Sequence, residues 1–576
     1  MKNSEVAVVL ERIGQLLEVD GEGSFKVRAY ERAAQSIEGL HDPLSQAIGE
    51  NRLTKVPGIG TSIAAKIEEI LSTGTCKAYE DLKRKVPPGV VAMLGIPGVG
   101  PKKAGVLYRE LKISSIDELE KAATAGRLRE HPGMGKKTEE NILEGIERLK
   151  ARPDRLGIGI VRPYAEAIVD ALRGTPGVTQ IEVAGSLRRW RETVKDLDVV
   201  AASSDPTALI EAFTLLPQVD KVILQGDTKT TVLTDLGIQA DLRVVAPGQF
   251  AALLNHFTGS MAHNVRLRTI ARSRGLRINE YGVFQEPGGE PVALGDDENA
   301  LYDLLKIQFV PPEMREDSGE VEAAAAGRLP VVVALSDIRC DLHCHTRYSD
   351  GTATVDEMAL AARDRGYSHL SIADHSPSLT VAHGLSVDDL RRQIKEIREW
   401  NDQNADDNFR LLAGTECDIL ADGSLDWPDE LLDELDVVVA SVHSRFKMEE
   451  KEMTARIVRA IQSGKVDIVG HPTGRLIGSR DPYALDIAAV LKAAKETGTC
   501  MEINAHPERL DLSDHHARLA KEMGLRIAIN SDAHSTDGLE VMEYGVHSAR
   551  RAWLAPDDVV NTYPVDRLLK VLAREE

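Results

Sequence analysis

Apolar residues recur at helical spacing near the start of the chain and at strand-like spacing further on. Val6, Val9, Leu10 and Ile13 fall three or four residues apart, which predicts a short amphipathic helix, and residues 1–50 continue this pattern. From about 155 to 310, β-rich apolar runs alternate with helical segments, which indicates one α+β domain. Its strands are expected at 178–184, 197–202, 220–224, 230–234 and 238–245.

A second alternation of short strands and helices begins after residue 338 and predicts an α/β barrel. Its strands are expected at 370–373, 410–413, 437–442, 467–469, 500–503 and 526–529. Between the two regions, residues 312–329 are acidic and rich in small side chains, the composition of a flexible tether. As a coil it would span roughly 20 to 25 Å.

Composition and charge limit which classes of protein this chain can belong to. The 576 residues carry a formal net charge of -21, concentrated in residues 311–576 with 49 Asp+Glu against 30 Lys+Arg. Residues 51–150 hold 18 Lys+Arg against 13 Asp+Glu, which permits phosphate contact there. The sequence has no leader-like start and no run of about 18 apolar residues, and its five cysteines form no CxxC pair. We therefore expect a cytoplasmic protein without a membrane partner.

Three Pro-Gly-x-Gly segments form a weak internal repeat at 56–60, 96–100 and 131–135, and each leads into a helical segment. Glycine allows a tight turn whose backbone N–H groups point at an anion near the start of the following helix. A single copy is as readily a helix–helix turn, but three copies within 80 residues favour contact with DNA backbone. They resemble helix-hairpin-helix motifs, and the expected DNA-binding glycines are Gly58, Gly60, Gly98, Gly100, Gly133 and Gly135.

Three aspartates suggest a phosphoryl-transfer site. Asp196 and Asp198 are two residues apart in a predicted strand, so both carboxylates project from one face, and Asp241 can join them from a neighbouring strand. Three convergent carboxylates can hold two Mg²⁺ or Mn²⁺ ions for an in-line displacement. Upstream, the segment Gly185-Ser-Leu-Arg-Arg189 offers a turn, a hydroxyl and two guanidinium groups for a triphosphate. An Asp-x-Asp pair alone is usually a pair of surface aspartates, whereas the composite pattern is specific.

With these motifs, residues 1 to about 310 resemble a family X DNA polymerase of the nucleotidyltransferase fold. The resemblance implies that Asp196, Asp198 and Asp241 bind the catalytic metals. It further implies nucleotide contacts from Gly185, Ser186, Arg189, Phe257, Thr258, Gly259 and Asn264, and a template contact from Arg268. His256 and Lys195 replace a tyrosine and a glycine of the vertebrate members, which leaves sugar discrimination and phosphate handling open.

Lys66 matches the Schiff-base lysine of the family's deoxyribose-phosphate lyase, and Tyr30 matches a tyrosine of that pocket. A lysine needs a depressed pKa to attack an aldehyde, which a sequence does not reveal. Lys66 can equally contact phosphate after the first hairpin. Loss of borohydride trapping in Lys66→Ala would support the lyase prediction, and unchanged trapping would remove it.

Nine potential metal ligands lie close to predicted strands in the last 240 residues of the chain: His343, His345, Asp350, His375, Glu416, His443, His471, Asp532 and His534. Imidazole and carboxylate ligands suit Zn²⁺, Mn²⁺ or Fe²⁺, and a site without a thiolate indicates a catalytic rather than a structural metal. Cys344 and Cys417 neighbour ligands, but alternation along a strand turns them away. Asp374 is expected to orient His375 or its neighbours.

Residues 338–576 resemble a PHP (polymerase and histidinol phosphatase) domain with all nine ligand positions filled. The resemblance implies a distorted seven-stranded barrel that holds up to three Zn²⁺ or Mn²⁺ ions and hydrolyses phosphoesters. Joined to a family X polymerase, it implies a metal-dependent 3′-5′ exonuclease and an endonuclease at abasic sites. Arg445 or Arg475 is expected to contact DNA phosphate.

The sequence therefore predicts a multidomain repair polymerase that acts as a monomer on gapped or nicked duplex DNA with dNTPs, in the cytoplasm and associated with the nucleoid. Its expected parts are a helical 8-kDa-like DNA-binding domain (1–90), a fingers-like helix-hairpin-helix region (91–154), palm and thumb (155–311), an acidic linker (312–337) and the PHP domain (338–576). Two alternatives stay open: a PHP nuclease or phosphatase whose polymerase half only docks DNA, and a small-molecule phosphatase whose hairpins serve protein packing.

Overall fold

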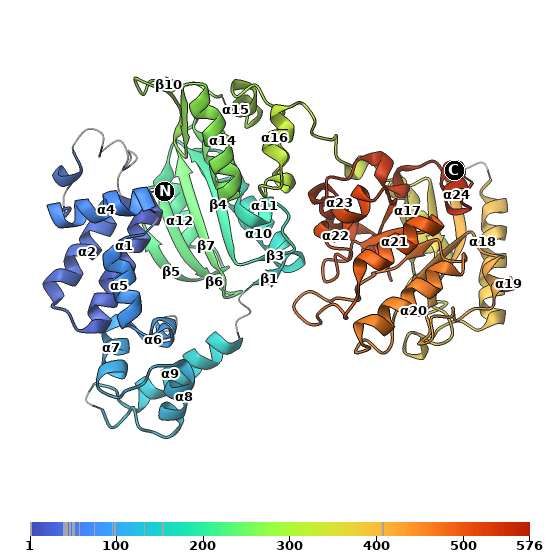
Figure 1. The fold of residues 1–576 in the computed structure, drawn as a ribbon, viewed down its shortest axis with the longest axis horizontal. Coiled ribbons are helices and arrows are strands. Elements are labelled where there is room, and N and C mark those ends of the chain that lie inside the picture. Colours follow the sequence, from blue (N-terminus) through green and yellow to red (C-terminus); the bar gives the residue numbers. More distant parts are fainter. Residues whose placement is uncertain are drawn as a thin grey trace. The chain divides into compact units, whose positions relative to one another are not determined.

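The computed structural model describes residues 3–38, 44, 48, 52–56, 58–73, 75–94, 96, 99–131, 133–151, 155–295, 297–405 and 408–575. The chain divides into two compact units, 1–154 and 155–576, whose folds are drawn in Figure 1. Within the described ranges, no helix is both long and apolar enough to cross a membrane.

The described part of the N-terminal unit is helical (Figure 1). Its elements are α1 (Asn3–Asp20), α2 (Ser24–Glu38), the 3-10 turn η1 (Leu53–Lys55), α4 (Thr61–Thr73), α5 (Lys77–Lys85), α6 (Pro88–Met93), α7 (Pro101–Arg109), α8 (Ile116–Thr124) and α9 (Lys136–Ala151). One apolar core joins them, and it contains Val6, Leu10 and Ile13 of α1. The predicted amphipathic helix is therefore confirmed.

Residues 155–311, called the sheet region below, are built on a five-stranded mixed sheet in the order β2-β4-β7-β6-β5 (Figure 1). Its strands are β2 (Val178–Val183), β4 (Asp196–Ser203), β5 (Val219–Gln225), β6 (Lys229–Thr234) and β7 (Gln239–Val245), which confirms all five predicted strands. The central strands β4 and β7 run parallel, and the other pairs are antiparallel. Helices α10 (Ile158–Arg173) and α12 (Pro206–Thr214) pack their apolar residues into the core of this sheet.

The remaining elements of the sheet region surround this sheet. Before β4 come β1 (Leu156–Gly157), the short helix α11 (Gly185–Arg188) and β3 (Thr193–Val194). After β7 come α13 (Phe250–Thr258), α14 (Met261–Ser273), a three-stranded antiparallel sheet of β8 (Leu276–Asn279), β9 (Gly282–Gln285) and β10 (Pro291–Val292), and α15 (Asn299–Leu304).

Residues 338–575, called the barrel region below, contain seven parallel strands that neighbour each other in chain order. They are β11 (Cys340–Cys344), β12 (His369–Ile372), β13 (Arg410–Asp418), β14 (Val437–Ser441), β15 (Ile468–Val469), β16 (Cys500–Asn504) and β17 (Ile527–Asn530). A parallel bridge between Cys344 and Ala533 brings the first and last strands together, which indicates a closed barrel. The predicted α/β barrel and its strands are confirmed.

Helices follow most barrel strands and lie outside them (Figure 1). They are α17 (Val355–Asp364), α18 (Val387–Gln403), α19 (Asp429–Leu432), α20 (Glu450–Gln462), α21 (Ile487–Thr497), α22 (Asp514–Glu522), α23 (Met542–Arg551) and α24 (Val565–Leu572), with 3-10 turns η4 (Thr380–Ala382), η5 (Asp537–Val541), η6 (Pro556–Asp558) and η7 (Val560–Thr562). Because the strands are parallel, their carboxyl ends all open at one face, where barrels of this kind gather functional side chains.

The segment between the two regions is ordered, and the prediction of a flexible tether is wrong. It forms η2 (Pro312–Met314), α16 (Glu320–Ala325) and η3 (Leu335–Asp337). Glu313 is buried, with Oε1 2.7 Å from Nδ1 of His547 and 2.6 Å from Nε of Arg550. Glu320 is also buried, 2.7 Å from Nδ1 of His263. Composition misled here because these acidic side chains meet buried partners from distant parts of the chain instead of solvent.

Candidate functional site

The three glycine hairpins share one geometry. The residue between the two glycines is buried in each, because Ile59, Val99 and Met134 are at most 4% exposed. Its N–H donates to the carbonyl three residues earlier at 3.1, 2.9 and 3.0 Å respectively. The second glycine of each hairpin comes directly before α4, α7 or α9.

The second glycine of each hairpin faces open space. An added Cβ would meet nothing within 4 Å at Gly60, Gly100 or Gly135, so packing does not demand glycine there. A bare backbone at a helix start instead leaves room for the close approach of an anion. Gly58 and Gly133 have φ of 87°, which favours glycine for conformational reasons. Gly98 lies outside the described residues.

The predicted carboxylate site lies on the two central strands of the mixed sheet. Asp198 of β4 stands beside Asp241 of β7 in the parallel register, and Asp196 is on the same face of β4 because Leu197 between them is buried. The Thr231 hydroxyl donates to Oδ1 of Asp241 at 2.6 Å. This contact orients one of the three carboxylates. An oxygen-rich, partly exposed set of this kind suits Mg²⁺ or Mn²⁺.

The turn before α11 is fitted tightly against this site. Gly185 has φ of 60°, and an added Cβ would lie 2.3 Å from Oδ2 of Asp198. The Ala184 N–H donates to the Asp198 carbonyl at 2.8 Å, which fixes the turn to β4. Only glycine therefore fits at this position without displacing the carboxylate.

Both arginines of the Gly-Ser-Leu-Arg-Arg segment reach the predicted sugar-pocket residues. Arg188 donates to the Thr258 hydroxyl at 2.7 Å, and Arg189 donates to the Thr258 carbonyl at 2.5 Å. Arg188 also pairs with Glu298 at 2.9 Å, and Arg189 with Glu316 at 3.0 Å. The pKa of Glu298, which burial alone would raise, is held at about 2 by Arg315 and Arg188. The predicted phosphate-binding and sugar-pocket segments are thus joined by charged hydrogen bonds.

Other predicted nucleotide contacts lie nearby. The His256 side chain is buried, and its Nδ1 lies 3.9 Å from Oε2 of Glu280. The Asn264 amide donates to the His256 carbonyl at 2.8 Å, so this amide is engaged within the protein. The Phe257 ring lies under the guanidinium of Arg243, 4.7 Å from the ring centroid. Ser186 lies on α11, Gly259 has φ of 68°, and Arg268 is half-buried on α14.

The nine predicted ligands of the barrel converge at the carboxyl ends of its strands. They form three overlapping groups in which the candidate ligand atoms lie within 4.8 Å of one another: His345, Asp350, His375 and His534; His343, His345 and Asp532; and His375, Glu416 and His443. His471 joins them, with Nε2 2.9 Å from Oε1 of Glu416. The structure brings all nine side chains together.

Unsatisfied buried atoms at this centre fit bound metal ions. His345 is fully buried, and neither of its ring nitrogens makes a well-formed hydrogen bond to a described residue, although Nε2 lies 3.1 Å from Oδ1 of Asp532. Well-formed hydrogen bonds to described residues are also missing at Nε2 of His343, Nδ1 of His375, Nδ1 of His471 and Oε2 of Glu416. Buried polar atoms without partners are costly, and coordination would satisfy them. Six imidazoles and three carboxylates form a donor set that suits Zn²⁺ or Mn²⁺.

The charges of the centre are strongly coupled. Burial, and then the neighbouring His375, lowers the pKa of His345 to about 3, which keeps this imidazole neutral as a ligand must be. Burial would raise the pKa of Glu416, but His443, His343 and His375 hold it well below its ordinary value. A central carboxylate ringed by imidazoles is the electrostatic arrangement expected where several cations share ligands.

Two carboxylates that lie beside the ligands were not predicted from the sequence. Glu502 of β16 is fully buried, with Oε1 2.8 Å from Nδ1 of His343 and Oε2 accepting the His471 N–H at 2.6 Å. Asp418 of β13 lies 3.3 Å from Nδ1 of His443. A signal existed for Asp418, because it lies two residues after Glu416 on one strand face. Contacts of this type fix ring orientation at metal sites.

Asp374 holds the loop between His345 and Asp350, two neighbours of His375. It accepts the Thr346 N–H at 2.8 Å and also bonds the hydroxyls of Thr346 and Ser349. It therefore holds the loop that leads to Asp350 rather than His375 itself. Cys344 and Cys417 are buried free thiols with pKa values raised by burial, and the metal-ligand groups found among the described residues contain neither of them.

Two basic residues singled out in the sequence are engaged within the protein. The Arg475 guanidinium pairs with Glu192 at 2.7 Å and donates to the carbonyls of Arg509 and Leu510, and a DNA-phosphate contact by Arg445 or Arg475 stays a prediction. Lys66 on α4 is half-buried and donates to the carbonyl and hydroxyl of Ser62, at 3.0 Å each. Its lyase role also stays a prediction.

Models of four protein families match the chain. A helix-hairpin-helix domain matches residues 1–76, a SAM-like helix-hairpin-helix tandem residues 90–148, a DNA polymerase beta thumb residues 253–316, and a PHP domain residues 341–506. These matches fall on the hairpins, on the segment after the mixed sheet and on the barrel.

Curated relatives match either the whole chain or the barrel. A DNA polymerase/3′-5′ exonuclease PolX from Bacillus subtilis (strain 168) is 38% identical over 578 residues, which covers 100% of both chains. A probable phosphatase from Thermoanaerobacter sp. (strain X514) is 33% identical over 235 residues, 38% of this chain and 89% of that protein. A probable phosphatase from Shewanella sp. (strain MR-4) is 28% identical over 248 residues, 41% of this chain and 91% of that protein.

Proposed function

Because this chain belongs to the family of PolX DNA polymerase/3′-5′ exonucleases, we propose that it fills short gaps in DNA during repair and trims DNA 3′ ends with its barrel region. The helix-hairpin-helix and thumb matches imply DNA binding. The full-length PolX match and the PHP match imply divalent metals, and the barrel carries the ligand groups for them. One observation carries the polymerase proposal. In a chain that matches a PolX protein over its full length, Asp198 and Asp241 lie side by side on neighbouring strands, and Gly185 packs so tightly against Asp198 that no larger residue fits there.

In the polymerase reaction, Asp196, Asp198 and Asp241 would hold two Mg²⁺ or Mn²⁺ ions, and such ions supply Lewis-acid stabilisation of an in-line phosphoryl displacement. The Thr231 hydroxyl keeps Asp241 oriented toward the site. Ser186 and Arg189 are proposed to contact the phosphates of an incoming dNTP, with Arg189 exchanging the Glu316 carboxylate for phosphate oxygens. Phe257, Thr258, Gly259 and Asn264 are proposed to bound the sugar and base.

In the barrel, the nine converging ligands would hold up to three Zn²⁺ or Mn²⁺ ions, with Lewis-acid activation as the chemistry supplied by bound metal. Glu502 holds His343 and the backbone of His471, and Asp418 holds His443, so these carboxylates fix the ligand orientations. The substrates proposed are DNA 3′ ends and, as a second phosphodiester substrate of the same centre, abasic sites.

DNA docking is proposed to use the open glycines of the hairpins, which position a gapped or nicked duplex without reading its sequence. Lys66 and Tyr30 remain the proposed lyase pair. We further propose that the protein acts as a monomer.

The alternative of a nuclease or phosphatase whose polymerase half only docks DNA is less well supported. The probable phosphatases match 38% to 41% of this chain, whereas the PolX relative matches all of it. An idle polymerase half would also have no need for the close fit of Gly185 against Asp198.

Reciprocal variants test the proposal. Asp196→Ala should abolish extension of a primer in a one-nucleotide gap and spare shortening of the same primer without dNTP. His345→Ala should do the reverse. If Asp196→Ala leaves extension intact, or if both variants lose both activities while keeping their wild-type melting temperatures, the assignment of two separate sites is wrong.

A further inference from the structure

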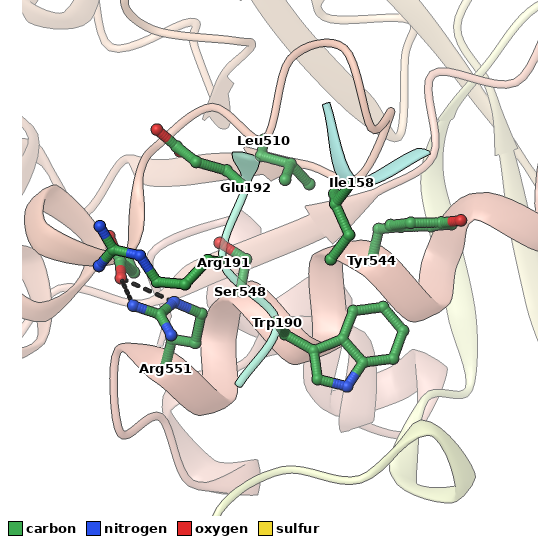
Figure 2. A pocket seen from close by; sticks show the side chains of 9 residues that line it. Ile158, Trp190, Arg191, Glu192, Leu510, Tyr544, Ser548 and Arg551 are labelled. Atoms are coloured by element: carbon green, nitrogen blue, oxygen red, sulfur yellow. Dashed lines mark hydrogen bonds and ion pairs between the residues drawn. The ribbon is translucent and has the colours of Figure 1, made fainter. Parts of the chain in front are cut away.

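The loop between β16 and α22, residues 505–513, faces both the barrel centre and the sheet region. Figure 2 shows Leu510 of this loop beside Ile158 of the sheet region, in a pocket that Trp190 of the sheet region and Tyr544 of the barrel region also line. Leu510 is 4% exposed and belongs to the apolar core of the mixed sheet rather than to the barrel core. Pro507 lies so close to Gly159 that an added Cβ there would be 2.6 Å from the proline. One side of the loop is therefore part of the sheet region's packing.

The other side of the same loop reaches the metal centre. Nε of Arg509 lies 3.4 Å from Oδ2 of Asp532, and the Asn504 amide, at the end of β16, donates to that oxygen at 3.0 Å. The second oxygen, Oδ1, lies 3.1 Å from Nε2 of His345 and 3.8 Å from Nε2 of His343. Arg509 and Asn504 thus hold one carboxylate oxygen and leave the other aimed at two imidazoles.

Arg475 ties the two sides together. Its Nε donates to the Arg509 carbonyl at 2.9 Å, one terminal nitrogen donates to the Leu510 carbonyl, and the same nitrogen pairs with Glu192 of the sheet region at 2.7 Å. The Arg475 side chain is only 13% exposed. A planar guanidinium can serve three acceptors in this way, whereas a lysine ammonium offers a point charge on a flexible stem.

We propose that Glu192 and Arg475 are positioning residues for the barrel metal centre. They hold loop 505–513 so that Arg509 and Asn504 aim Asp532 at His343 and His345. Because Glu192 belongs to the sheet region, docking of that region against the barrel sets part of the geometry of the metal centre. This inference rests on the proposed nuclease site, but it concerns metal binding, which can be measured without any turnover.

The test uses full-length protein stripped of metal with a chelator and carrying Asp196→Ala and Asp198→Ala, so that Mn²⁺ binding reports on the barrel. Mn²⁺ is titrated while free Mn²⁺ is followed by electron paramagnetic resonance. Partners that orient metal ligands typically contribute ten- to 100-fold in metal affinity. We expect Arg475→Gln to weaken binding at least about tenfold, and Glu192→Gln, which keeps the two carbonyl contacts, about threefold.

A double variant and a matched control separate positioning from other roles. Glu192→Gln combined with Arg475→Gln should bind Mn²⁺ no more weakly than Arg475→Gln alone, because both act through one contact. Arg391→Gln removes an exposed ion pair with Glu434 on the same region, 3.2 Å apart, and should bind like the parent protein. Arg475→Lys should fall between the parent and Arg475→Gln.

Three results would overturn the proposal. Parent-like Mn²⁺ affinity in both Arg475→Gln and Glu192→Gln would show that the contacts only hold the two regions together. Additive losses in the double variant would show that the two residues act independently. A loss of DNA binding by Arg475→Gln in chelator, with unchanged Mn²⁺ affinity, would show Arg475 to be a DNA contact instead. If the parent binds Mn²⁺ but never shortens DNA, the proposed nuclease is wrong while the positioning result stands.

Discussion

Replacing Gly185 by alanine should cripple the polymerase site while leaving the barrel centre untouched. The added Cβ would lie 2.3 Å from Oδ2 of Asp198, and contacts of this kind below 3.0 Å essentially never occur. Gly185 cannot retreat easily, because the neighbouring Ala184 N–H is bonded to the Asp198 carbonyl. The Asp198 carboxylate must therefore move.

The size of the effect follows from that distance. The carboxylate has to shift by about 0.7 Å to reach an acceptable contact, and a misplacement near 1 Å in a catalytic site costs about 100-fold in rate. We expect the rate of extension to fall about 30- to 100-fold. Alanine at φ of 60° should also cost about 1 to 2 kcal/mol of folding stability, because a Cβ is strained in the left-handed region.

Gly248→Ala is the matched control. Gly248 also has positive φ, 88°, but an added Cβ would meet nothing within 4 Å. Both variants should lose similar stability in thermal unfolding, whereas only Gly185→Ala should lose single-turnover extension, and both should shorten DNA at the wild-type rate. Equal extension rates in the two variants would refute the argument that the glycine protects Asp198.

Three further predictions concern other contacts. Burial would raise the pKa of Glu313, but His547 and Arg550 hold it at about 2, below its ordinary 4.5. Ionised Glu313 therefore contributes about 3 kcal/mol to the free energy of unfolding. This contribution is complete above pH 4.5 and is lost as the pH falls toward 2. The difference in unfolding free energy between Glu313→Gln and wild type should therefore shrink by more than half between pH 7 and pH 3. A difference independent of pH would show that the Glu313 charge does not stabilise the fold. Glu502→Gln should weaken Mn²⁺ binding about ten- to 100-fold in a metal titration, and parent-like affinity would show that its contacts to His343 and His471 do not orient them. Gly60→Leu should weaken binding of a gapped duplex about fivefold in fluorescence anisotropy without lowering the melting temperature. Gly23→Leu, at a glycine outside the hairpins that is equally open, should bind the duplex with wild-type affinity. Equal affinities of the two variants would argue against contact between DNA and the backbone at the first hairpin.

Sequence patterns predicted the strands and the ligand set because both have short-range signatures. The alternation of His343 with His345, and of Asp196 with Asp198, places each pair on one face of a strand whatever the rest of the chain does. The apolar runs that became β2, β4 to β7 and β12 to β17 are bounded by turn residues, so even short strands were predicted, whereas β3 and β8 to β10 were not.

The contacts that tie distant segments together could not be predicted in this way. Glu313 lies 237 residues from Arg550, and Glu192 lies 283 residues from Arg475. Composition suggested a solvated tether, because local sequence does not show which charged side chains will be buried against each other. Glu502 was missed for the same reason, since its partner His343 lies 159 residues away.

We propose that this chain holds two active sites that act on DNA, a polymerase site in the sheet region and a nuclease site in the barrel region. The most direct measurement places a 5′-labelled primer in a one-nucleotide gap with purified protein and Mn²⁺, with and without the matching dNTP. We expect extension by one nucleotide with dNTP and progressive shortening without it. Shortening under both conditions, with no extension, would show that the sheet region only docks DNA.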